Sequence, residues 1–209
     1  MKFFFLLLAT LAWTIPTSAE DTKLSLARPR ESIWENELGS GLRYDSLNVG
    51  LSLGGAFGMK VLGGSESHDF VLGSVHAGWV ISGVKATNHW YRGNWELVGE
   101  LFGGGQVNPT SAYLIGLTPF IRYDFATGTR WVPFVEAGAG VTATDIGKPD
   151  LGTTFEFNLQ AGVGVHYFLR EYLAVTLQYR YMHFSDANIG TPNLGVNSNA
   201  VLAGISWWF

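Results

Sequence analysis

Several features that define other protein classes are missing from this chain of 209 residues. It has no cysteine, which excludes disulfide bonds and thiolate chemistry. Beyond the N-terminus there is no apolar run of about 18 residues, so a membrane-spanning helix is not expected. Charged residues make up only 14% of the chain, and the net charge of −4 gives no reason to expect nucleic-acid binding.

What the chain does contain favours β-structure. Hydrophobic residues make up 47% of it, aromatic residues 14%, and there are 27 glycines. This balance is more typical of many short strands than of helices. The length suits one domain or one closed barrel.

The N-terminus has the pattern of a secretory signal peptide. Met1 and Lys2 form a short positive start, residues 3–13 are apolar, and residues 17–19 are small. We therefore predict that residues 1–19 are a cleaved export signal, with an uncleaved anchor as the alternative. Residues 20–46 follow as an N-terminal extension whose role the sequence leaves open.

From Leu47 onward, apolar and polar residues alternate with a period of two. The stretch 154–165 is the clearest case, with Phe155, Phe157 and Leu159 alternating with polar or small residues. Eight such segments fill residues 47–209, separated by turn residues. This pattern predicts an all-β fold, an eight-stranded antiparallel transmembrane β-barrel of the bacterial outer membrane. The alternative is a soluble sandwich or lipocalin-like barrel, whose apolar face points inward.

Two observations favour the membrane barrel. Glycines and opposite charges share the polar face, where a narrow barrel could enclose an ion-pair network. The charged residues expected in this network are Glu96, Glu100, Glu136, Glu156, Arg122 and Arg180. The C-terminal residues Gly204, Trp207 and Phe209 also resemble the recognition signal of outer-membrane barrels. In an even-stranded barrel both termini face the periplasm, so the connection 186–196 is expected outside, with short inner turns and longer outer loops.

The last strand pair carries the candidate chemistry. His183 and Ser185 are two residues apart, so both should lie on one face of a strand, and this face is the apolar one. Histidine is the usual base for a serine nucleophile, and a lipid-facing pair predicts a lipid substrate. If the hairpin pairs symmetrically, Asn197 lies opposite His183 and can orient its imidazole. Asn193, Asn188 and backbone N–H groups near Gly190 and Gly195 are candidate oxyanion donors.

These residues also carry a family resemblance. The stretch His183-Phe-Ser185-Asp-Ala-Asn-Ile189, followed by Pro192-Asn193-Leu-Gly195, resembles the lipid A 3-O-deacylases of the PagL type. That family is an eight-stranded outer-membrane barrel that hydrolyses the ester-linked acyl chain at position 3 of lipid A. The resemblance implies lipopolysaccharide as substrate, with no metal or cofactor.

By position, the resemblance assigns the base to His183, the nucleophile to Ser185 and the oxyanion residue to Asn193. Two positions depart from the family pattern. The asparagine after the serine is Asp186 here, and the acidic member of the triad falls on Asn197. Asp186 is therefore an alternative candidate for the acid, although its strand parity is opposite to that of His183.

The chain offers an internal comparison for this motif. Ser74 and His76 have the same spacing, but their strand parity directs them into the barrel, where we expect them to line the lumen. Two other functions remain open: a non-catalytic barrel that acts as an adhesin or envelope-structural protein, and a hydrolase of phospholipid. The oligomeric state is open as well.

Overall fold

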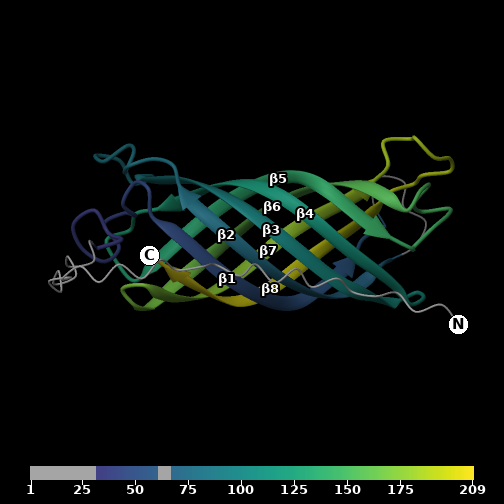
Figure 1. Cartoon of the computed structure of the whole chain (residues 1–209), viewed down its shortest axis with the longest axis horizontal. Coiled ribbons are helices and arrows are strands. Elements are labelled where there is room, and N and C mark those ends of the chain that lie inside the picture. Colours follow the sequence, from purple (N-terminus) through teal and green to yellow (C-terminus); the bar gives the residue numbers. More distant parts are fainter. Residues whose placement is uncertain (1–31, 61–66) are drawn as a thin grey trace, which may run out of the picture. The chain divides into compact units, whose positions relative to one another are not determined.

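The computed structural model describes residues 32–60 and 67–209, so the predicted signal peptide and residues 20–31 lie outside the described part. The described residues form a closed barrel of eight antiparallel strands in sequential order, with β1 pairing with β8 (Figure 1). The predicted fold class is therefore confirmed. Within the described ranges, no helix is long and apolar enough to cross a membrane.

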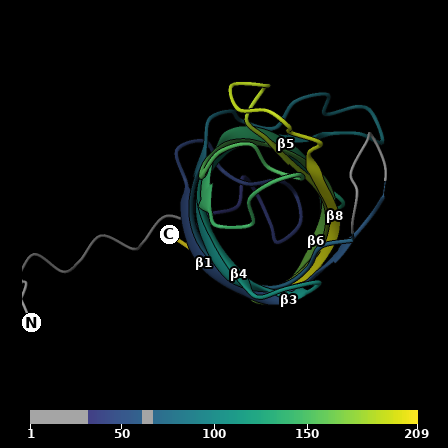
Figure 2. The same cartoon turned by 90° about the vertical axis from the view of Figure 1, so that its right-hand side faces the viewer.

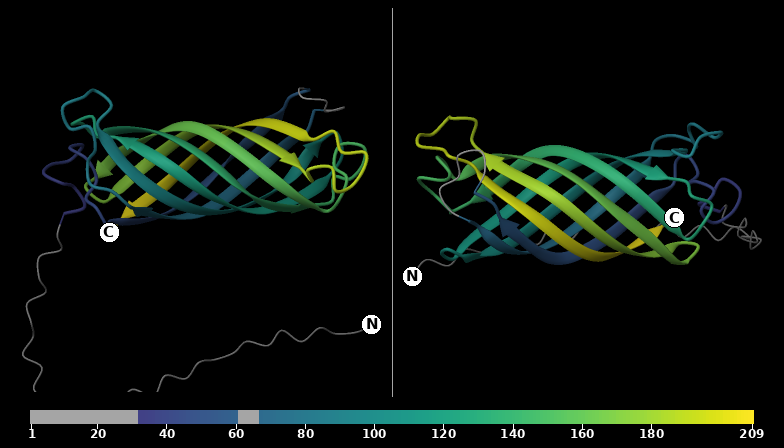
Figure 3. Two further views of the ribbon diagram at one scale, coloured as in Figure 1. Left: turned by 90° about the horizontal axis from the view of Figure 1, so that it is seen from above. Right: turned by 180° about the vertical axis from the view of Figure 1, so that it is seen from behind.

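The strands begin at Leu47, as the alternation predicts. They are β1 (Leu47–Gly58), β2 (Asp69–Val80), β3 (Gly93–Asn108), β4 (Ala112–Phe125), β5 (Trp131–Thr144), β6 (Phe155–Arg170), β7 (Leu173–Ser185) and β8 (Val196–Trp208). They run obliquely around the barrel in both views of Figure 3.

Connections at the two barrel ends only partly follow the predicted difference in length. The turn after β6 is short, and the connections 145–154 and 186–195 at the opposite end are long. However, the connection 81–92 lies at the same end as the short turns and is long, whereas 109–111 at the other end is short. Loop length alone is therefore a weaker guide to orientation in this chain than strand number.

The alternation along each strand separates an apolar outer wall from a filled interior. On β6, Phe157 and Leu159 are 42% and 55% exposed, whereas Asn158 between them is fully buried. Successive side chains of a strand point to opposite faces, so this difference follows from the sequence period alone. Viewed from one end, the strands close into a complete ring (Figure 2).

A network of buried ion pairs lies inside the ring. Arg122 contacts Glu96 at 3.2 Å and Glu136 at 2.8 Å. Arg180 contacts Glu136 at 3.0 Å and also pairs with Glu100. Each of these five side chains is at most 5% exposed, so the charges compensate one another without bulk water. This part of the predicted network is present.

The fourth glutamate of the predicted network lies elsewhere. Glu156 is buried near the start of β6 and accepts hydrogen bonds from Thr153 rather than from either arginine. Glu156 is the second residue of β6 and follows the connection 145–154, so it lies at the end of the barrel rather than beside the arginines. Strand parity gave the correct face for Glu156 but not its height in the barrel.

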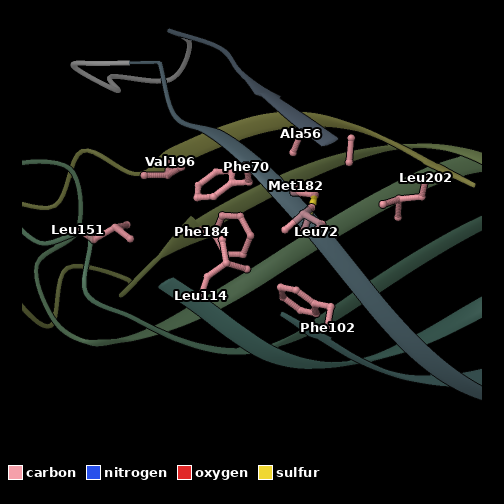
Figure 4. Packing of buried hydrophobic residues seen from close by; sticks show 11 residues of the cluster. Ala56, Phe70, Leu72, Phe102, Leu114, Leu151, Met182, Phe184, Val196 and Leu202 are labelled. Carbon is pink, nitrogen blue, oxygen red and sulfur yellow. The ribbon is translucent and has the colours of Figure 1, made fainter. Parts of the chain in front are cut away.

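Apolar clusters occupy the lumen on either side of the ion pairs. One lies toward the end where β7 finishes, and Figure 4 shows its packing. Its members are Ala56, Phe70, Leu72, Phe102, Leu114, Leu151, Met182, Phe184, Val196, Ala200 and Leu202. The other lies at the end where β1 begins and is made of Ile33, Trp34, Leu42, Val80, Val132, Phe168, Ala174 and Trp208.

The segment 32–46 contributes Ile33, Trp34 and Leu42 to this second cluster, a contribution that the sequence did not indicate. The Trp34 indole donates to the Glu171 carbonyl oxygen at 3.0 Å. The Leu42 N–H donates to the Asn94 side-chain oxygen at 2.7 Å, and the Asn94 amide donates back to the Leu42 carbonyl at 2.8 Å. The segment before β1 therefore packs into the barrel and closes this end of the lumen.

Removal of the Arg180 cation should destabilise the barrel. In Arg180→Met the buried Glu100 carboxylate loses its cationic partner, and we expect unfolding in urea from lipid vesicles to cost about 3–5 kcal/mol less. Tryptophan fluorescence can follow the transition. The double variant with Glu100→Gln should recover part of the loss, since it removes the uncompensated charge. Equal stability of all three proteins would contradict a stabilising role for the pair.

Candidate active site

His183 and Ser185 lie at the end of β7 and face outward. They share a face with Tyr179, which is 48% exposed, while the intervening Met182 and Phe184 are only 2% and 3% exposed. Across the sheet, His183 pairs with Leu159 and Ser185 pairs with Phe157, two exposed apolar residues of β6. The polar pair therefore sits in an apolar stretch of the outer wall.

Asn197 lies opposite His183, as symmetric pairing of the hairpin predicts. The His183 Nδ1 atom is 2.8 Å from the Asn197 side-chain oxygen. A carbonyl oxygen can only accept, so Nδ1 carries the proton and Nε2 holds the free lone pair. This is the tautomer in which an imidazole can take a proton from a hydroxyl group.

Tyr181 is a member of this site that the sequence analysis missed. Its hydroxyl donates to the same Asn197 oxygen at a distance of 2.6 Å. Tyr181 is two residues before His183 on the outward face and is the diagonal neighbour of Asn197 across the strand pair. Diagonal neighbours of an antiparallel pair are within reach of long side chains, so the predicted register could have indicated this contact.

Ser185 is positioned beside the histidine but is not bonded to it. The structure gives no hydrogen bond between the Ser185 hydroxyl and His183, both of which lie in the described part of the chain. Side chains two apart on a strand emerge roughly 6.6 Å from each other, and rotation about the side-chain bonds must close that gap. Such bonds are often long in a free enzyme and shorten when the substrate binds.

Asp186 follows the serine but faces away from the histidine. It is fully buried, and its carboxylate accepts the Gly190 N–H at 2.8 Å. Ala187 and Asn188 both have positive φ, at 56° and 64°, and Ile189 N–H donates back to the Asp186 carbonyl at 3.2 Å. Asp186 therefore fastens the tight turn after β7, and the structure does not bring it to His183.

The same loop reduces the choice of oxyanion donors. The N–H groups of Leu194 and Gly195 donate to the Asp150 carbonyl at 3.0 and 2.8 Å, and the Gly190 N–H is bonded to Asp186. Of the candidates, the side-chain NH2 groups of Asn188 and Asn193 donate to no group within the described ranges, so these two amides remain as candidate donors to an oxyanion.

The connection 145–154 supports this loop from the side. Besides the Asp150 contacts, the Lys148 ammonium group donates to the Thr191 carbonyl at 2.6 Å. Gly152 lies so close that a Cβ there would be 2.5 Å from the Asp186 carboxylate and 2.6 Å from the Gly190 carbonyl oxygen. The two loops interlock, and only glycine fits at the point of contact.

The lumen-facing motif and possible metal ligands are the remaining candidates for chemistry. The Ser74 hydroxyl donates to Glu100 at 3.3 Å inside the barrel, as expected for a lumen residue. Across residues 32–60 and 67–209, no group of three or more His, Asp or Glu side chains is arranged to hold a metal ion.

Filling the contact at Gly152 should loosen the active-site loop. In Gly152→Val the new side chain must displace Asp186 or the backbone at Gly190, and we expect the free energy of local opening to fall by about 1–3 kcal/mol. Faster amide hydrogen exchange over residues 186–195 would report it. Gly99→Val is the matched control because a Cβ at Gly99 meets nothing within 4 Å. Unchanged exchange in Gly152→Val would refute the interlock.

Comparison with known proteins identifies relatives of most of the barrel. The sequence model of the lipid A 3-O-deacylase (PagL) family matches residues 73–206. The lipid A deacylase PagL of Bordetella bronchiseptica is 31% identical over 121 residues. That match covers 53% of this chain and 64% of the relative, which is less than two thirds of the relative's length.

Two solved structures have the same fold. The crystal structure of the outer membrane enzyme PagL superimposes with a TM-score of 0.55 at 20% identity, covering 75% of this chain and 97% of the other. Neisserial surface protein A superimposes with a TM-score of 0.59 at 18% identity, covering 78% and 97%. Together with the family match, this fold makes the molecule a barrel of the outer membrane, and His183 and Ser185 lie on the outward face of its β7 strand.

Proposed function

We propose that this chain, which belongs to the lipid A 3-O-deacylase (PagL) family, hydrolyses the ester-linked 3-O-acyl chain of lipid A at a lipid-facing site made by Ser185 and His183. One observation carries the assignment of the site. His183 is held by Asn197 in the tautomer of a general base, beside a serine, on the apolar outer face of the barrel. A soluble substrate would not be expected to reach a pair placed there.

The position of the pair favours lipopolysaccharide over other esters. Because the number of strands is even, the start of β1 and the end of β8 both face the periplasm. Strand β7 therefore runs toward the outside and ends in the outer leaflet. In a bacterial outer membrane that leaflet is made of lipopolysaccharide. Phe157 and Leu159, which flank the pair on β6, offer an apolar surface to the acyl chain that the ester carries.

The reaction would follow the logic of a serine esterase. Ser185 Oγ attacks the carbonyl carbon of the 3-O-ester while His183 Nε2 takes the hydroxyl proton. The Asn193 amide donates to the resulting oxyanion. Collapse breaks the bond to the 3-oxygen of lipid A, which leaves with the proton from His183. A water molecule, deprotonated by His183, then releases the fatty acid from Ser185. The scheme uses side chains and water alone.

Asn197 occupies the position where the family pattern has an acidic residue. A carboxylate at this position has three roles. The Asn197 oxygen fills two of them, because it orients the imidazole and selects its tautomer. The third, charge stabilisation of the imidazolium, is weaker with a neutral amide. We therefore expect a working enzyme whose proton-transfer steps are slower than those of a triad with a carboxylate.

Substitution of Ser185 should abolish deacylation. We expect lipid A from a Gram-negative host that expresses this chain to lose the mass of one hydroxyacyl group, and lipid A from a host with Ser185→Ala or His183→Gln to keep it. Mass spectrometry of extracted lipid A measures the change. The matched control is Ser74→Ala, which alters the lumen-facing serine of the same motif and should leave deacylation intact.

Each other outcome has a defined meaning. If Ser185→Ala still deacylates lipid A, the assigned nucleophile is wrong. If the unmodified barrel is present in the outer membrane and no ester is cleaved, the protein is a non-catalytic barrel. If lysophospholipid appears in place of deacylated lipid A, the substrate is a phospholipid.

A further inference from the structure

We infer that Tyr181 is a positioning residue, whose hydroxyl holds the Asn197 amide with its oxygen toward His183 and thereby keeps His183 in the tautomer of a general base. The catalytic part of this inference rests on the proposed function. The structural part, which concerns the orientation of an amide and the position of a proton, can be tested without activity.

The need for such a residue follows from the difference between a carboxylate and an amide. A carboxylate has two equivalent oxygens, so either one can accept the imidazole N–H. An amide has one oxygen and one NH2 group. If the Asn197 amide turned over, its NH2 group would donate to His183 Nδ1, and the imidazole proton would move to Nε2. Nε2 could then no longer accept the proton of Ser185.

The observed contacts oppose this turned-over state. The hydroxyl of Tyr181 and Nδ1 of His183 both approach the Asn197 side-chain oxygen, at 2.6 and 2.8 Å. A carbonyl oxygen has two lone pairs, so both donors can be satisfied at once. Asn197 itself is only 2% exposed, so water has little access to offer alternative partners.

The phenol proton supplies the bias between the two orientations. Within the described ranges, the structure gives the Tyr181 hydroxyl no hydrogen bond other than that to Asn197. In the turned-over state the hydroxyl oxygen would accept from the amide NH2, and the phenol proton would be left without an acceptor on a lipid-facing wall. An unsatisfied donor in such surroundings favours the observed orientation by roughly 10-fold to 100-fold.

The barrel wall contains a matched comparison for this contact. Tyr179, one pleat away on the same face of β7, donates through its hydroxyl to the Asn199 side-chain oxygen, also at 2.6 Å. Asn199 pairs with Tyr181 rather than with His183. Tyr179→Phe and Tyr181→Phe thus remove the same kind of bond from the same wall, and only the second removes a bond to Asn197.

The first experiment compares deacylation rates on lipid A in mixed micelles. We expect Tyr181→Phe to lower kcat by about 2-fold or more, in proportion to the Nε2-protonated fraction that appears, with little change in KM, and Tyr179→Phe to leave both parameters unchanged. In an Asn197→Asp background, where the two oxygens are equivalent, Tyr181→Phe should cost much less. A purely structural role for Tyr181 would give the same loss in both backgrounds.

The second experiment observes the tautomer directly. Nitrogen NMR of the histidine-labelled protein in micelles should show His183 protonated at Nδ1 in the wild type and in Tyr179→Phe, with a substantial Nε2-protonated fraction in Tyr181→Phe. His183→Gln identifies the signal.

The outcomes separate the two proposals. If the wild type deacylates lipid A and Tyr181→Phe behaves like Tyr179→Phe in rate and tautomer, the inference is wrong and the proposed function stands. If the wild type cleaves nothing but Tyr181→Phe alone shifts the tautomer, the proposed function is wrong and the structural part of the inference stands.

Discussion

The structure depends on one constraint, which is that a sheet surrounded by hydrocarbon must pair every backbone N–H and C=O group within itself. Pairing of β1 with β8 meets this requirement by removing both free edges. Once the ring is closed, the two faces of every strand have fixed environments, lipid outside and a narrow lumen inside. The buried ion pairs of Arg122 and Arg180 and the exposed apolar wall are two consequences of that single closure.

The candidate chemistry uses the same geometry. Strand pairing sets which residues are neighbours, and His183, Asn197 and Tyr181 meet because β7 and β8 pair in one register. The loop that carries Asn193 is less constrained by the sheet, and here the contacts to Asp150, Asp186 and the connection 145–154 fix the backbone instead. Rigid strands thus hold the base, while two interlocked loops hold the oxyanion candidate.

Features that follow from the two-residue alternation along each strand could be predicted from the sequence. Strand positions, the outward face of His183 and Ser185, and the pairing of His183 with Asn197 could all be predicted from parity and a symmetric hairpin. Contacts between distant segments could not. The packing of residues 32–46 into the barrel and the fit of Gly152 against Gly190 depend on loops whose paths have no periodic signature. Glu156 was assigned the correct face but the wrong partners, because parity carries no information about height.

The filled lumen also determines by which route substrate and products reach and leave the site. With an apolar cluster on each side of the ion pairs, one of them including Trp34, side chains of the described residues fill the interior along the way that a lipid would have to take. Under the proposed function, substrate and both products must exchange sideways, within one leaflet. Turnover would then obey the kinetics of a two-dimensional fluid, in which the rate depends on the mole fraction of substrate in the membrane surface rather than on its amount per volume of cell.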